Sequence, residues 1–181
     1  MNSFIQDKGN RMNVYGNIMS IEAGDGFESA TTVTNGFVNL FMEWSGLISA
    51  ENLLLPATTL TDSCYSNMFY GCTGLTQAPA LPATALANGC YSNMFNGCTS
   101  LTSAPELPAL TLAENSYSAM FYGCSSLNYI KCLATNIQEN NCTDNWVYGV
   151  SGSGTFVKNP SMASWPSGDS GIPSGWTTQN G

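Results

Sequence analysis

The sequence predicts an α/β solenoid in which each coil of the chain contains a short strand, a turn and a short helix. Two observations lead to this fold class: a repeat of constant length that begins at Leu55, Leu81 and Leu107, and an apolar pattern with helical spacing inside each repeat. The three clear repeats occupy residues 55–80, 81–106 and 107–132, and the first two are identical at most of their positions. A unit of this length cannot bury an apolar face alone, so we expect the coils to stack at strand spacing, about 4.8 Å apart.

The helix of each coil is expected early in the repeat. Its apolar residues follow the spacing i, i+3, i+4, i+7, which marks one face of a helix of about two turns. In the first repeat these residues are Tyr65, Met68, Phe69 and Cys72. Gly71 would end this helix in a left-handed conformation, and residues 75–81 are expected to form the strand. Phe95, in the middle repeat, should be fully buried between coils.

We divide the chain into an N-terminal cap rich in strands (1–36), the solenoid with degenerate repeats at both ends (37–152) and a C-terminal cap (153–181). Within the N-terminal cap, the pattern over residues 13–21 predicts a strand pair. In the C-terminal cap, residues 155–158 are expected to form a last strand. The rings of Trp165 and Trp176 are expected to close the open end of the core.

The composition excludes several classes of function. The net charge is −8 with four basic residues, so nucleic acids and anionic membrane surfaces would be repelled. The chain has no histidine, which removes Ser-His-Asp and Cys-His catalysis, and we expect a protein that is not an enzyme. No apolar run approaches the length of a membrane span. The first residues lack the apolar region of a signal peptide, so we expect an intracellular protein or one whose leader was removed.

The seven cysteines are interpreted as packing residues. They form the column Cys64, Cys90 and Cys142, the column Cys72, Cys98 and Cys124, and the separate Cys132. Ser116 takes a place in the first column and Val150 continues the second, so both columns favour a small buried side chain over a ligand. Zinc needs more closely clustered thiolates, and no metal or cofactor is expected. An occasional disulfide between stacked coils stays open as an alternative, although the odd count argues against full pairing.

Two short motifs are interpreted as turns or loops. Residues 168–171 spell GDSG, the sequence around the nucleophile of trypsin-like proteases, but no histidine is present to activate Ser170. Residues 149–154 are rich in glycine but lack the Lys and Ser/Thr that follow in a phosphate-binding loop.

The repeated columns resemble a known family. The pattern F-x-G-C-x-x-L-x-x-x-x-x-L-P, here Phe69, Gly71, Cys72, Leu75, Leu81 and Pro82, is similar to the repeats of BspA-like surface proteins, in a Bacteroidetes-type variant. The usual unit of that family is shorter and has Ala-Phe where this chain has Met-Phe. The resemblance covers residues 37–181. It implies a right-handed leucine-rich-repeat solenoid at the surface of a bacterial cell or outside it, an adhesin-like role, and a chain that is a fragment of a longer protein.

The strand face is the candidate binding surface, because repeat proteins use a concave sheet of stacked strands for ligands. Its outward-pointing candidates differ between repeats while the core columns do not; they are Thr76, Gln77, Thr102, Ser103, Asn128, Tyr129 and Lys131. The variation is explained equally well if these side chains only face water and have changed without selection for binding. Tyr129 is the most interface-like of them, and Lys131 is expected to act on the association rate with an acidic partner.

We therefore expect a non-enzymatic recognition module, extracellular or on the cell surface, that binds a protein or a glycan through this face. A structural spacer or assembly component, for instance in a surface layer or a phage-type appendage, is the alternative. That alternative predicts self-association in place of a soluble ligand.

Overall fold

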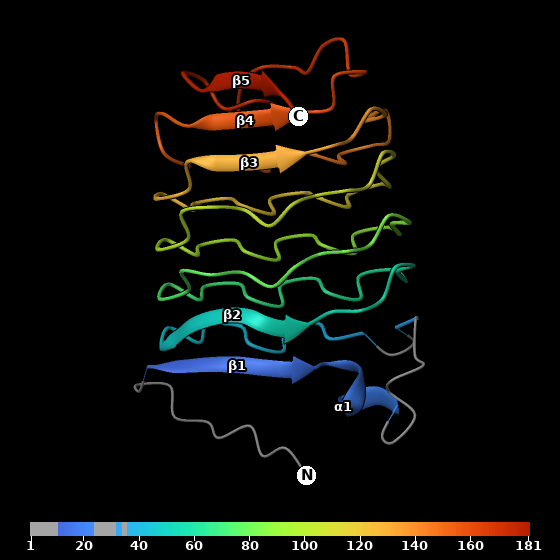
Figure 1. The fold of residues 1–181 in the computed structure, drawn as a ribbon, viewed down its shortest axis with the longest axis vertical. Coiled ribbons are helices and arrows are strands. Elements are labelled where there is room, and N and C mark those ends of the chain that lie inside the picture. Colours follow the sequence, from blue (N-terminus) through green and yellow to red (C-terminus); the bar gives the residue numbers. More distant parts are fainter. Residues whose placement is uncertain (1–10, 24–31, 34–35) are drawn as a thin grey trace.

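The computed structural model describes residues 11–23, 32–33 and 36–181 (Figure 1). Its elements are β1 (Met12–Asn17), α1 (Met19–Ala23), β2 (Leu47–Leu54), β3 (Tyr129–Cys132), β4 (Thr155–Lys158) and β5 (Thr177–Asn180). β1 and β2 form a two-stranded parallel sheet, and β3, β4 and β5 form a three-stranded parallel sheet. Between the two sheets the chain runs in layers that lie one above another, with isolated parallel bridges such as Ser49 to Gln77 and Ser103 to Tyr129.

The predicted fold class, an α/β leucine-rich-repeat solenoid with a helix in each coil, is wrong. Among the described residues α1 is the only helix; it has five residues and lies outside the repeats. Regular strands are confined to the two small parallel sheets. The segment of each repeat that was expected to be helical consists of consecutive turns instead.

Left-handed residues at every fourth position explain why no helix forms. In four successive layers the backbone φ angle is positive, between 49° and 74°, whereas an α-helix needs about −63° at every residue. These residues are Ser63, Asn67 and Gly71, then Gly89, Asn93 and Gly97, then Asn115, Ala119 and Gly123, then Asn141, Asn145 and Gly149. Gly and Asn are the residues that adopt this conformation most readily. Gly71 is therefore left-handed as predicted, but as one of a series and not as the end of a helix.

Backbone hydrogen bonds in these turn segments alternate between two kinds of acceptor. The N–H of Tyr65 donates to the carbonyl of Cys90 in the next layer (3.0 Å), and the N–H of Phe69 donates to Met94 (2.9 Å). The residue between them, Met68, donates to the carbonyl of Tyr65 within its own turn (3.2 Å). The same alternation recurs in the next two layers, so neighbouring layers are joined along their whole turn segments.

Two columns of stacked aromatic rings run through the core. One contains Phe37, Tyr65, Tyr91, Tyr117 and Trp146, with ring centroids 5.8–6.2 Å apart. The other contains Phe41, Phe69, Phe95, Phe121 and Trp146, at 5.3–6.3 Å. Phe95 has no exposed surface, which confirms its predicted burial. Since each ring of the clear repeats packs on its counterpart one repeat away, the repeat period fixes the arrangement of the core.

The C-terminal segment closes the core where the two ring columns meet. Trp165 stacks on Trp146 with centroids 5.7 Å apart, and Phe156 of β4 packs edge-on against both rings. Trp176 is buried, and its indole N–H donates to the carbonyl of Ser151 (2.7 Å). The predicted closing role of the two tryptophans is confirmed, and β4 matches the predicted last strand.

The GDSG segment completes the last turn segment. The hydroxyl of Ser170 accepts a hydrogen bond from the N–H of Asn145 (2.9 Å), and the carbonyl of Asp169 accepts one from the N–H of Val147 (3.1 Å). These are the alternate N–H groups that donate to the next layer elsewhere in the chain. Residues 168–171 therefore form a structural turn, as predicted.

The N-terminal part differs from its prediction. The expected strand pair over 13–21 is wrong, because β1 is a single strand and α1 follows it. β1 pairs instead with β2, which comes much later in the chain. Of the predicted cap, residues 1–10, 24–31 and 34–35 lie outside the described residues.

We predict that Phe95→Ala destabilises the protein by about 3–5 kcal/mol, because it leaves a cavity between two stacked rings. Thermal unfolding followed by circular dichroism measures the loss. Tyr122→Ala, which removes a ring that is 39 % exposed, is the control and should shift the melting temperature far less. Equal melting temperatures for wild type and Phe95→Ala would contradict the ring columns.

The substitution Ala119→Gly distinguishes the turn segment from a helix, because the two structures predict changes of opposite sign in the free energy of unfolding. Ala119 has φ +49°, and glycine relieves a left-handed strain of about 1–2 kcal/mol. Glycine also makes the unfolded chain more flexible, which lowers the free energy of unfolding by about 0.4–1 kcal/mol. Because the relief of strain is larger, we expect a net gain in the free energy of unfolding. In a helix the same change would cost about 1 kcal/mol. Ala113→Gly, at a position without positive φ, is the matched control and should destabilise.

Candidate binding face

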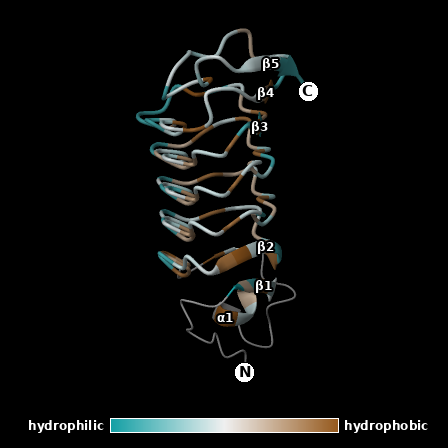
Figure 2. Ribbon diagram, turned by 90° about the vertical axis from the view of Figure 1, so that its left-hand side faces the viewer, coloured by the Kyte–Doolittle hydropathy of each residue, from teal (hydrophilic) through white to brown (hydrophobic). Residues whose placement is uncertain are grey.

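The strand face is the surface formed by β2, β3, β4 and β5 together with the extended segments 75–81 and 101–107 between the two sheets. Parallel pairing joins Tyr129 to Ser103 on one side and to Thr155 on the other, and Thr155 to Thr177. The layers follow one another along a nearly straight axis in Figure 2, and this face is one side of that stack. Backbone pairing thus holds Gln77 beside β2, and it holds Ser103 beside Tyr129.

Thr76 and Gln77 are exposed and are held by the layer that contains β2. The backbone N–H and the hydroxyl of Thr76 both donate to the carbonyl of Ile48, each at 2.9 Å. The side-chain amide of Gln77 donates to the carboxylate of Glu51 at 3.1 Å. Both side chains therefore have defined positions on the surface.

Thr102, Ser103 and Asn128 are also exposed, and their backbones belong to the ladder. The N–H of Asn128 donates to the carbonyl of Thr102 (3.0 Å), and the carbonyl of Asn128 accepts the N–H of Thr155 (2.9 Å). The hydroxyl of Ser103 donates weakly to the carbonyl of Ala104 (3.3 Å). Hydroxyl and amide groups without charge thus lie one layer below Tyr129 and beside it.

Tyr129 and Lys131 point to the same side of β3, because Ile130 and Cys132 between and after them are buried. The ring of Tyr129 is 38 % exposed. The ammonium of Lys131 forms a salt bridge with the carboxylate of Glu106 (2.9 Å), and this hydrogen bond with its negative partner raises the pKa of Lys131. Because Glu106 neutralises Lys131 locally, Lys131 offers less steering of an acidic partner than the sequence suggested.

A second exposed aromatic feature was missed by the sequence analysis. Tyr122 and Tyr148 stack with centroids 4.8 Å apart, and both are partly exposed. They belong to the turn segments and not to the strand face. Their separation by one full repeat period was the signal that would have revealed the pair.

The thiols are free and buried at all seven cysteine positions, which agrees with the packing interpretation. Those of Cys72, Cys98 and Cys124 each donate to a phenylalanine carbonyl of the preceding layer, at 3.0–3.1 Å. Burial raises the pKa of Cys72 and Cys124 to about 12, and raises the pKa of Cys98 well above its ordinary value. The thiols thus stay protonated at neutral pH, and protonated thiols are poor nucleophiles and poor ligands.

Over the described part of the chain, no group of three or more His, Cys, Asp or Glu residues is placed to hold a metal ion. In the same part, no helix has the length and the apolar character needed to cross a membrane. No protein-family model, curated protein or solved structure matches the chain. The strand face is therefore supported as the candidate site by its geometry alone.

We predict that a maleimide reagent labels few of the seven thiols in the native protein and up to seven after denaturation without reductant. The physical reason is that attack requires an exposed thiolate, whereas burial keeps these groups protonated. Mass spectrometry of the labelled chain counts the sites. Prompt labelling of most sites in the native protein would contradict the packing, and resistance after denaturation would reveal disulfides.

Proposed function

We propose that the chain is a non-enzymatic recognition module that binds a protein or a glycan through the strand face. The observation that carries this proposal is Tyr129, a side chain that is 38 % exposed and is paired through its backbone on both sides. Uncharged hydroxyl and amide groups lie beside it, and the Lys131–Glu106 ion pair lies on the same side of β3. A rigid ring of this kind gives contact area at low entropic cost. Hydroxyl and amide groups supply directional hydrogen bonds to either a polypeptide or a sugar.

The fixed backbone favours recognition because little order has to be created on binding. Thr76 and Gln77 have partners within the chain, and Tyr129 is paired on both sides of its strand. A binding surface that is already ordered loses less conformational entropy when a ligand arrives. The side chains differ from layer to layer, so one backbone arrangement presents different groups along the stack.

The proposed location, on a cell surface or outside the cell, rests on the resemblance of the repeated columns to BspA-like surface proteins. We propose an adhesin-like role on the same ground. An alternative role as a structural spacer or assembly component finds support in a different feature, the exposed strand β5 at one end of the stack.

The test begins with an array of glycans and proteins probed with the chain, followed by titration of any ligand found. We predict that Tyr129→Ala weakens binding by about 2 kcal/mol, roughly thirtyfold in Kd, because a central aromatic ring often dominates an interface. Tyr122→Ala is the matched control, since it removes a ring of nearly equal exposure, 39 % against 38 %, away from the strand face.

Loss of binding in Tyr122→Ala but not in Tyr129→Ala would move the site to the turn segments. A ligand that tolerates both changes would also contradict the strand-face proposal.

A further inference from the structure

The strand β5 forms an open edge at one end of the stack. The N–H of Thr177 donates to Gly154 and the N–H of Gly181 donates to Lys158, both toward β4. Because N–H groups alternate in direction along a strand, those of Thr178 and Asn180 point away from β4. All four residues of β5 are exposed. Among the described residues β5 pairs with β4 alone, so this edge presents unused donors and acceptors.

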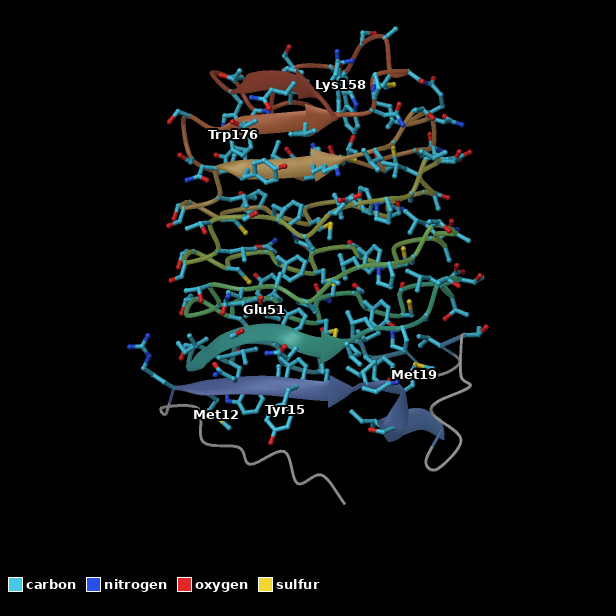
Figure 3. The ribbon with its side chains drawn as sticks, viewed as in Figure 1. Met12, Tyr15, Met19, Glu51, Lys158 and Trp176 are labelled. Atoms are coloured by element: carbon cyan, nitrogen blue, oxygen red, sulfur yellow. The ribbon has the colours of Figure 1, made fainter. Side chains whose placement is uncertain are left out.

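The strand β1 forms the corresponding edge at the opposite end. The N–H of Met12 donates to Gly46 and that of Ile18 donates to Leu54, both toward β2. Within the described part of the chain, β1 has no other strand partner. Its Tyr15 is 79 % exposed, the largest exposure among the large apolar side chains that the structure describes, and Figure 3 shows it pointing away from β2 and the rest of the stack.

The two edges match each other in direction and in charge. All pairings in both sheets are parallel, and the strand arrows of Figure 1 run the same way from β1 to β5. A second copy placed above the first would therefore bring its β1 onto β5 as a further parallel strand. Neither strand contains a charged residue, although the chain carries a net charge of −8. Charged side chains are a common means of blocking edge pairing, and both edges lack them.

We propose that copies of this chain associate head to tail, with β5 of one copy paired in parallel with β1 of the next. The contact repeats the parallel pairing that joins β1 to β2, β3 to β4 and β4 to β5 within the chain. Such an interface uses two different surfaces, so each added copy leaves both kinds of edge free and the assembly stays open-ended. This inference does not depend on any ligand of the strand face, and it adds an interaction surface to the proposed recognition role.

The first measurement is the molar mass of the chain by size-exclusion chromatography with light scattering at increasing concentration. The expected mass rises above that of the 19.2 kDa monomer without a plateau, through at least about twice that value. A monomer at every concentration would overturn the proposal.

Thr178→Pro tests the β5 edge, because proline removes an outward N–H and leaves the bonds to β4 in place. The expected result is loss of self-association with an unchanged melting temperature. Asn180→Pro repeats the test at the other outward N–H in case the first variant fails to fold. Thr178→Val keeps the N–H and is the matched control, which should still associate.

Tyr15→Asp tests the opposite edge by placing a charge on β1, and this variant too should fail to self-associate. A mixture of Tyr15→Asp and Thr178→Pro decides the geometry. Each variant keeps the edge that the other lacks, so the mixture should form a defined heterodimer of about twice 19.2 kDa. If Tyr15→Asp associated like the wild type while Thr178→Pro did not, two β5 edges would be pairing with each other and the head-to-tail arrangement would be wrong.

Discussion

The structure depends on how the turn segments divide their backbone hydrogen bonds. Every second N–H closes a turn within its own layer, and the others donate to carbonyls of the next layer. This division requires a left-handed residue at every fourth position, as at Asn67, Gly71, Asn93 and Gly97. A regular helix would keep all its hydrogen bonds to itself and could not join one layer to the next. The left-handed residues thus make the stacking of layers possible.

The aromatic columns follow from that constraint and in turn limit the sequence. Bonds between layers hold each Phe and Tyr over its counterpart, so a ring in one layer can be replaced only by another flat side chain. Trp146 contacts the last ring of both columns where they converge, and Trp165 stacks on Trp146. Surface residues have no such restriction, which is why Gln77, Ser103 and Tyr129 differ at equivalent positions. Variation on the strand face is compatible with the core because the two sets of side chains point in opposite directions.

Much of the core could be predicted from the sequence. The turn segments could not, and they were expected to be helices. The repeat period places Phe95 between Phe69 and Phe121, and the structure confirms this arrangement. The spacing i, i+3, i+4, i+7 fits one face of an α-helix, but it also fits a turn segment in which buried residues recur every four positions. The Asn and Gly residues that also recur every four positions, such as Asn67 and Gly71, distinguish the turn segment from a helix. The reason is that left-handed residues do not recur within an α-helix. The exposure of the strand-face candidates was predictable from their columns. The pairing of Lys131 with Glu106 was not, because the two residues lie in different repeats and share no column.

The two sides of the stack end differently at the C-terminal layer. On the turn side, Ser170 and Asp169 accept the N–H groups of Asn145 and Val147, so two donors of that layer have acceptors within the chain. On the strand side, β5 adds one more ladder of the same parallel kind and moves the open edge outward without closing it. A stack held together by bonds between layers must end somewhere, and its two ends leave donors or acceptors without a neighbouring layer. The tail supplies acceptors for two N–H groups on the turn side, whereas on the strand side the outer edge of β5 stays open. Water satisfies an exposed edge at little cost, so the fold is stable with β5 open, and the same edge stays available to a strand from another molecule.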